Sequence, residues 1–128
     1  MPACTIDYGH PSFKNGAKDA KKRHHSFLDS LASIVKAIQA DPTTVGTLIR
    51  SADPTHHVRK VRVGCPKESI PERKGYRVIF QVLEVNGSPY VRMLDCYYKP
   101  NQADIPAEAI KRLVDIAPPP SDVPVDSN

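Results

Sequence analysis

The sequence has no tryptophan, no long apolar run and only three cysteines among its 128 residues. A transmembrane helix needs a run of about 18 or more apolar residues, and the absence of such a run excludes that class of protein. The first ten residues, MPACTIDYGH, contain neither a basic segment nor an apolar one. We therefore expect no secretory signal and no association with a membrane.

The cysteines are few, odd in number and scattered, at Cys4, Cys65 and Cys96. They show no C-x-x-C spacing and have no histidine at the distance that zinc ligands require. Small, apolar and usually buried, a free cysteine most often serves to fill the core. The sequence thus favours a reduced, cytoplasmic protein without a metal or a cofactor.

Acidic residues are scarce in the middle of the chain. The formal net charge is +4, and residues 50–77 alone carry eight Lys or Arg against three Asp or Glu. From residue 113 onward there are three Asp and no basic residue. A localised positive surface favours a polyanion such as nucleic acid, or an acidic protein partner. A solvated face without a partner has the same composition, so charge alone leaves both interpretations open.

The spacing of apolar residues predicts several helices. A short basic helix is expected over 13–22, with Ser12 as its N-cap, although Gly16 weakens it. The clearest amphipathic helix covers 24–40 and ends at Asp41-Pro42. Its apolar stripe consists of Phe27, Leu28, Leu31, Ile34, Val35 and Ile38. Further helical segments are expected over 44–50 and 106–116.

The remaining segments predict strands. A short strand is expected over 3–8, a basic strand over 58–63 and a hairpin over 75–99 that turns at Asn86-Gly87. The prolines and charges of 64–74 predict a loop. Together these elements predict an α+β fold over 1–116, with helices covering one face of a mostly antiparallel, twisted sheet of about four strands. Residues 117–128 predict a flexible, proline-rich acidic tail.

Alternation along the hairpin separates two faces. One is apolar and should lie under the helices: Tyr76, Val78, Phe80 and Val82. The other carries Arg77, Ile79, Gln81 and Leu83. A regular turn would add Arg92, Leu94, Cys96 and Tyr98 to the Arg77 face, whereas a bulge in the turn would bring Lys99 there in place of Tyr98. Lys60 and Arg62 join this solvent-facing side if Val61 and Val63 point to the core.

In the order of these blocks, the sequence resembles the RelE/ParE superfamily, the toxins of type II toxin–antitoxin systems. The similarity covers about residues 5–114, and its most specific block is GYRVIF over 75–80. Residues 12–42 resemble the two-helix opening of the family, 59–63 its basic strand, and 97–113 its last strand and closing helix. The resemblance implies a RelE-like fold, a cognate antitoxin, and, for RelE-type members, metal-free cleavage of mRNA on the ribosome.

The same resemblance implies catalytic residues. Carried over by position, these are Lys60 and Arg62 of the basic strand, Arg77 and Lys99, and we add Tyr98, which could stack on a base or orient a proton. Metal-free cleavage needs a base for the 2′-hydroxyl, positive charge at the phosphate and an acid for the leaving 5′-oxygen. Lys60 is the expected base, its pKa lowered by neighbouring cations, while the arginines clamp the phosphate. Further RNA contacts are predicted for Lys67, Arg73, Lys74 and Arg92.

Other functions remain open at this point. The superfamily also contains ParE-type gyrase inhibitors, which use the same scaffold without the nuclease cluster, so a non-catalytic binding protein is an alternative. A general RNA-binding module is another. Where the best-known RelE-type members have a functional tyrosine, before the closing helix, this sequence has Asp104-Ile105-Pro106. The basic run Lys18, Lys21, Lys22 and Arg23 fits an rRNA contact and a solvated helix face equally well.

Overall fold

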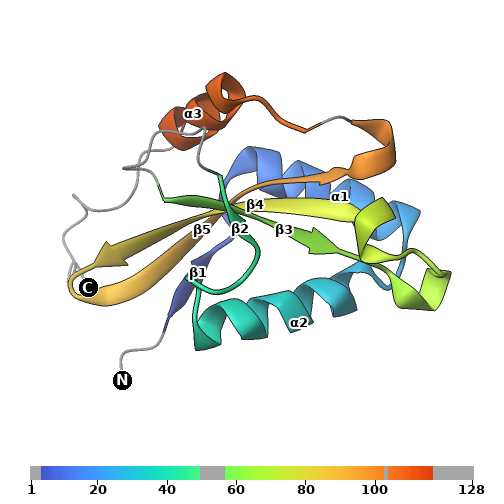
Figure 1. Ribbon diagram of the computed structural model, residues 1–128, viewed down its shortest axis with the longest axis horizontal. Coiled ribbons are helices and arrows are strands. Elements are labelled where there is room, and N and C mark those ends of the chain that lie inside the picture. Colours follow the sequence, from blue (N-terminus) through green and yellow to red (C-terminus); the bar gives the residue numbers. More distant parts are fainter. Residues whose placement is uncertain (1–3, 50–56, 103, 117–128) are drawn as a thin grey trace.

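The computed structural model describes residues 4–49, 57–102 and 104–116. These residues form an α+β fold of three helices and one five-stranded mixed sheet with strand order β1-β5-β4-β3-β2 (Figure 1). The predicted fold class is confirmed, with one strand more than the four expected. The additional strand is the short edge strand β2 (Thr47–Leu48), and the strand predicted over 3–8 is present as the opposite edge strand, β1 (Thr5–Asp7). The predicted tail over 117–128 lies outside the described residues.

The centre of the sheet is the antiparallel trio β3 (Val58–Val63), β4 (Tyr76–Val85) and β5 (Ser88–Tyr98). The predicted hairpin is confirmed: Val85 pairs with Ser88 across a two-residue turn. Asn86 and Gly87 both have positive φ, 53° and 78°, as a type I′ turn requires. β1 runs parallel to β5, while β2 pairs antiparallel with β3.

Helix α1 (Pro11–Arg23) is capped by a histidine. His10 Nδ1 accepts the backbone N–H of Ser12 at 3.1 Å, so Nε2 carries the proton and donates it to the Leu113 carbonyl at 2.7 Å. The prediction of Ser12 as N-cap is wrong, because the Ser12 hydroxyl donates to Asp95 on β5 instead, at 2.7 Å. One buried imidazole thus joins the start of α1 to the last turn of α3 (Ala107–Ile116).

Gly16 lies inside α1 despite its low helix propensity. A Cβ built at this position would lie 2.0 Å from the carbonyl oxygen of Cys96 on β5. The glycine therefore allows the helix to approach the strand backbone more closely than any other residue would permit.

Helix α2 (Phe27–Ala40) begins three residues later than predicted, because a turn precedes it. Phe27, Leu31 and Ile38 of the expected stripe are buried, whereas Leu28 is 41% exposed, which contradicts its assignment to the core. A residue that follows Phe27 directly is rotated by about 100° around the helix axis, so Leu28 faces away from the sheet.

The helix predicted over 44–50 is wrong, because the chain forms β2 there and pairs with Arg59 and Lys60. Arg59 holds the preceding loop extended by donating to the carbonyls of Val45 at 2.8 Å and Gly46 at 3.1 Å. Gly46 has a φ of +70°, which ends any helical path. Arg50 lies outside the described residues.

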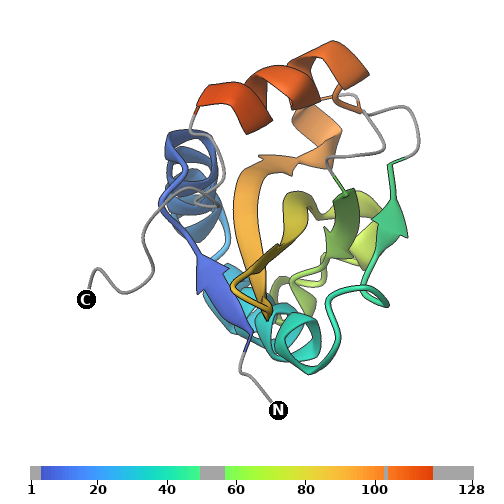
Figure 2. The ribbon, with the colours of Figure 1, turned by 90° about the vertical axis from the view of Figure 1, so that its left-hand side faces the viewer.

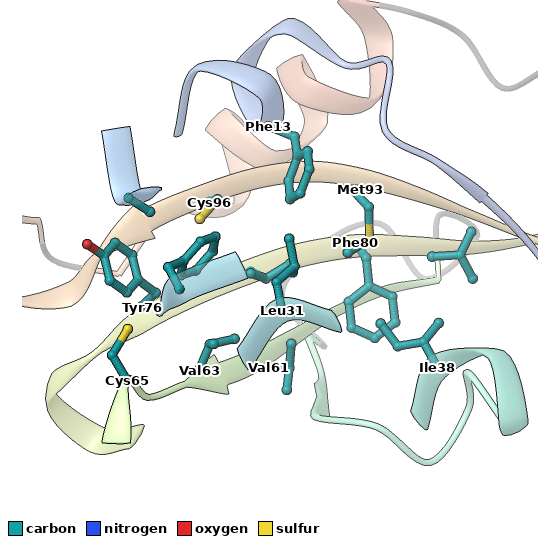
Figure 3. Packing of buried hydrophobic residues seen from close by; sticks show 14 of the residues in the cluster. Phe13, Leu31, Ile38, Val61, Val63, Cys65, Tyr76, Phe80, Met93 and Cys96 are labelled. Carbon is teal, nitrogen blue, oxygen red and sulfur yellow. The ribbon is translucent and has the colours of Figure 1, made fainter. Parts of the chain in front are cut away.

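Helices cover both faces of the sheet, not one as predicted. Helices α1 and α2 pack on the face that carries Tyr76, Val78 and Phe80, and Figure 3 shows this larger core. Helix α3 lies across the opposite face (Figure 2), where its predicted apolar residues pack on β4 and β5. This second core consists of Val58, Ile79, Leu94, Tyr97, Ile110, Leu113 and Val114. None of the helices in the described ranges is long and apolar enough to cross a membrane.

A β-bulge in β5 decides which side chains meet on each face. Ile79 pairs with Asp95 but Phe80 pairs with Met93, so Leu94 is an extra residue on β5. The predicted register is correct from the turn to the Phe80–Met93 pair and wrong beyond the bulge. There, Tyr98 pairs with Tyr76 and Tyr97 pairs with Arg77. The bulge is in mid-strand and not in the turn, but it has the consequence expected of a bulge: Tyr98 leaves the Arg77 face.

Candidate functional site

Four of the predicted catalytic residues lie on one face at the end of the sheet where β4 begins and β5 ends. Arg62 pairs with Arg77 across β3 and β4, and Lys60 lies one position further along the same face of β3. Lys99 follows β5 with the same alternation that places Tyr97 beside Arg77. The predicted gathering of Lys60, Arg62, Arg77 and Lys99 is therefore present, and we call these four residues the cation cluster.

Asp104 joins two members of this cluster. Its Oδ1 atom lies 3.4 Å from Lys60 Nζ and accepts a hydrogen bond from Lys99 Nζ at 3.1 Å. The hydrogen bond from Lys99, followed by the charge of Lys60, lowers the pKa of the Asp104 carboxyl. Lys60 thus has an acidic neighbour, whereas the sequence predicted cations alone around it. Asp104 itself was recognised only as a departure from the family tyrosine, without a function.

Arg77 is buried, and its guanidinium donates hydrogen bonds to backbone carbonyls. It is 4% exposed and donates to the carbonyls of Glu72, Arg73 and Tyr76 at 3.0–3.1 Å. Desolvation by burial, with the nearby charge of Arg62, lowers the pKa of Arg77. The prediction of a solvent-facing arginine fork at this position is wrong. Arg77 instead fixes the turn η3 (Glu72–Lys74) and is the buried member of the cation cluster.

Tyr97, which the sequence did not single out for the site, takes the place expected for Tyr98. It pairs with Arg77 and is 7% exposed. Burial raises the pKa of Tyr97 to about 12, and the charge of Asp104 adds to this effect. The Ile105 backbone is near enough to oppose the shift, but among the described residues no group forms a well-aligned hydrogen bond with the Tyr97 hydroxyl. A buried hydroxyl without a partner beside a charged cluster is unusual in a purely structural setting.

Two hollows flank β3 next to the cluster. One of about 570 Å³ is lined by Lys60, Arg62 and Glu72 together with Gly46 and Thr47. The other, of about 350 Å³, again includes Arg62 and Glu72 and continues toward the loop after β3. A bound anion would therefore find room directly beside Lys60 and Arg62.

Tyr98 lies on the opposite face, so the prediction that it lines the same cleft as Arg77 is wrong. Its ring centroid is 5.0 Å from that of Tyr76, and the Arg23 guanidinium lies 4.8 Å from the Tyr98 ring centroid. A hollow of about 200 Å³ adjoins these residues. Tyr98 thus belongs to a second, aromatic site on the α1 side of the sheet.

The predicted RNA-binding residues are dispersed. Arg73 and Lys74 are exposed on η3, next to the cation cluster. Lys67 is exposed and pairs with Asp29 of α2 at 3.3 Å. Arg92 is only 3% exposed and donates to Gln81 at 3.3 Å, so its predicted position on a solvent-facing surface is wrong.

The three cysteines are buried free thiols, as the sequence predicts. Within the part of the chain that the structure describes, no three His, Cys, Asp or Glu side chains lie close enough together to hold a metal ion.

Comparison of the chain with models of protein families, with curated proteins and with solved structures finds no match. The case for a function therefore depends on the geometry of the two sites and on the resemblance in the sequence.

Proposed function

We propose that this protein is the toxin of a toxin–antitoxin pair: a cytoplasmic endoribonuclease that cleaves ribosome-bound mRNA, inhibits translation and is neutralised by a cognate antitoxin. The observation that carries this proposal is the sharing of one Asp104 oxygen by Lys60 and Lys99, beside the charges of Arg62 and Arg77. Two ammonium groups that converge on one carboxylate oxygen are also spaced to bind the anionic oxygens of one phosphodiester.

The reaction follows from the chemistry of RNA. The 2′-oxygen attacks the adjacent phosphorus, the bond to the 5′-oxygen breaks, and the products carry a 2′,3′-cyclic phosphate and a 5′-hydroxyl. We assign phosphate binding to Lys60 and Arg62, and donation of a proton to the leaving 5′-oxygen to Lys99. We assign acceptance of the 2′-hydroxyl proton to the Asp104 carboxylate, because it lies against both lysines at the proposed phosphate site. This assignment replaces Lys60, the base expected from the sequence.

The surroundings of the cluster support an extended polyanion. The hollow of about 570 Å³ places Lys60 and Arg62 on its wall, and Arg73 and Lys74 lie exposed at the adjoining turn. Arg77 contributes its charge from below without making a direct contact. An RNA strand along β3 would thus meet positive charge at several successive phosphates, and we expect salt-dependent binding.

The test is cleavage of a short mRNA bound to ribosomes, followed by primer extension, with wild-type protein and with Lys60→Ala and Lys99→Ala. Loss of the proposed contacts at the phosphate should reduce the cleavage rate by about 100-fold or more. Lys14→Ala, which removes an exposed lysine of α1, is the matched control and should cleave normally. Cleavage by Lys60→Ala and by Lys99→Ala at the wild-type rate would contradict the proposal.

A non-catalytic binding protein on the same fold is the second candidate. It is favoured by the pairing of Lys60 and Lys99 with the Asp104 carboxylate, and by the hydrogen bonds of the Arg77 guanidinium to backbone carbonyls. Induced expression in bacteria separates the two functions. Intact mRNA with loss of DNA supercoiling would identify a ParE-type gyrase inhibitor, whereas early cleavage of mRNA would identify the nuclease.

A further inference from the structure

The face opposite the cation cluster carries an aromatic site that the proposed cleavage reaction does not use. Tyr76 and Tyr98 lie side by side, and the ring of His24 is 5.4 Å from that of Tyr98. His24 Nδ1 is 2.8 Å from the Tyr76 hydroxyl, which fixes the inner part of the site. The Arg23 guanidinium lies against the Tyr98 ring at 4.8 Å, a cation–π distance.

A hollow of about 200 Å³ adjoins this group, and we call it the aromatic pocket. Its lining combines Tyr98 and Arg23 with three polar residues, Asp19, Asn101 and Gln102. Pockets for drug-sized ligands usually measure about 300–1,000 Å³, so this one suits a smaller, single planar group.

We propose that the aromatic pocket binds one nucleobase of the RNA substrate, an inference that rests on the proposed nuclease function. A base offers a flat π-face, which stacks on tyrosine rings and on arginine guanidinium planes. Arg23 is exposed and its guanidinium lies over the Tyr98 ring, so a base that stacks on the outer face of the guanidinium extends this stack. The pocket therefore recognises the base, while the cation cluster binds the phosphate.

The polar lining favours a base over an aromatic side chain of a partner protein. The edge of a base carries several hydrogen-bond donors and acceptors, and Asp19, Asn101 and Gln102 can match them with an acceptor carboxylate and two amides. A tyrosine or tryptophan side chain has a single polar atom and can hydrogen-bond with only one of these exposed groups at a time.

The positions of the two sites fit one RNA strand. Tyr98 and Lys99 are consecutive but belong to opposite faces, and the turn η4 (Lys99–Asn101) continues from Lys99 to the rim of the aromatic pocket at Asn101. A nucleotide whose phosphate lies at Lys60 and Lys99 can thus direct a neighbouring base around the end of β5. This arrangement would make the base next to the cleavage site a determinant of sequence preference.

Binding of the four free ribonucleosides tests the pocket without the phosphate site. Resonance shifts of the ¹⁵N-labelled protein should concentrate at Arg23, Tyr98, Asn101 and Gln102, with at least one base bound more tightly than the others. Tyr98→Leu should weaken that binding about tenfold or more, as expected for loss of base stacking, whereas Tyr98→Phe should retain it. Arg23→Gln should also weaken this binding, whereas the matched control Lys22→Gln, at the exposed neighbouring position of α1, should leave it unchanged.

Cleavage kinetics add a readout that a structural role alone would not produce. Tyr98→Leu should raise KM for an RNA that carries the preferred base and leave kcat nearly unchanged, provided that its urea midpoint matches that of Tyr98→Phe. Three outcomes would each overturn the proposal that the pocket binds a base. They are nucleoside-induced shifts on another surface, no shifts in the wild type, and nucleoside binding by Tyr98→Leu that equals the wild type. Shifts at the pocket in a protein that does not cleave RNA would support the pocket and reject the nuclease function.

Discussion

Tyr98 and Lys99 are neighbours in the chain, yet they belong to two chemically different sites. On the α3 side of the sheet, Lys99 meets Lys60 and Asp104 in a cluster of charges that solvent can reach. On the α1 side, Tyr98 contacts Tyr76 and Arg23 beside a small pocket. One strand end thus contributes side chains to two chemically different surfaces, because successive side chains of a strand point to opposite faces of the sheet.

One extra residue establishes this division. The bulge at Leu94 shifts the register, so Tyr97 and not Tyr98 lies beside Arg77. Without the bulge, Tyr98 would lie among the cations and Lys99 among the aromatic rings. Bulges are frequent next to functional sites because they redirect side chains in this way.

The largest expected effect is on stability, and it separates the buried from the exposed members of the cation cluster. Arg77→Met should destabilise the protein by about 3 kcal/mol, because the carbonyls of Glu72, Arg73 and Tyr76 lose a charged donor. Arg62→Met, at an exposed position of the adjacent strand, should change stability by less than about 0.5 kcal/mol but weaken RNA binding. Urea unfolding and binding at two salt concentrations measure both quantities. Equal stability of the two variants would contradict the structural role of Arg77.

The next effect concerns Asp104, the acidic residue that pairs with two members of the cation cluster. Asp104→Asn frees Lys60 and Lys99 from their shared carboxylate, so affinity for RNA should rise by about fivefold, or about 1 kcal/mol. The same variant loses the proposed proton acceptor, and the cleavage rate should fall by about 100-fold. Fluorescence anisotropy and primer extension give the two values. A rise in both would show that Asp104 only competes with RNA and takes no part in proton transfer.

A smaller effect compares the buried Tyr97 with the half-buried Tyr90 at high pH. The pKa of Tyr97 is about 12 in the folded protein against an ordinary value of 10.0, so the unfolded state loses this proton first and stability should fall as pH rises from 10 to 12. Tyr97→Phe should make that fall shallower and should not reduce stability at neutral pH, because its hydroxyl makes no well-aligned hydrogen bond among the described residues.

Tyr90 provides the matched variant. Its pKa is also raised to about 12, first by burial and then by its hydrogen bond to Asp7 at 2.7 Å. Tyr90→Phe should also make the loss of stability between pH 10 and 12 shallower. At neutral pH, however, it should lower stability by about 1 kcal/mol through loss of that hydrogen bond. Urea midpoints at pH 8 and across the alkaline range measure both variants. A stability loss for Tyr97→Phe as large as that for Tyr90→Phe would indicate a hydrogen bond at Tyr97.

The smallest effect is expected away from both sites. Lys67 and Asp29 form an ion pair in which both side chains are 74% exposed. Lys67→Ala should change stability by less than about 0.5 kcal/mol, because exposed pairs gain little in water. It should also leave nucleoside binding intact. A decrease in RNA affinity as large as that of Arg62→Met would extend the RNA path beyond the charged face to α2.

The amino-acid sequence by itself determined the elements whose apolar spacing is regular. Local periodicity and turn chemistry predict helix α2, the hairpin with its Asn86-Gly87 turn, and the buried face of α3. Alternation along each strand also assigns Lys60 and Arg62 of β3 to the face that Arg77 occupies on β4. These features depend on residues close together in the chain, where side-chain direction is fixed by the backbone period.

The tertiary structure alone decided the composition of the two sites. A bulge has no strong local signature, so the exchange of Tyr98 for Tyr97 and Lys99 could not be read from alternation. The position of α3 on the second face depends on contacts with Ile79 and Leu94, and the same packing brings Asp104 to the lysines. Burial of Arg77 and Arg92 likewise depends on long-range packing, because a charged side chain is buried only where distant segments supply its partners.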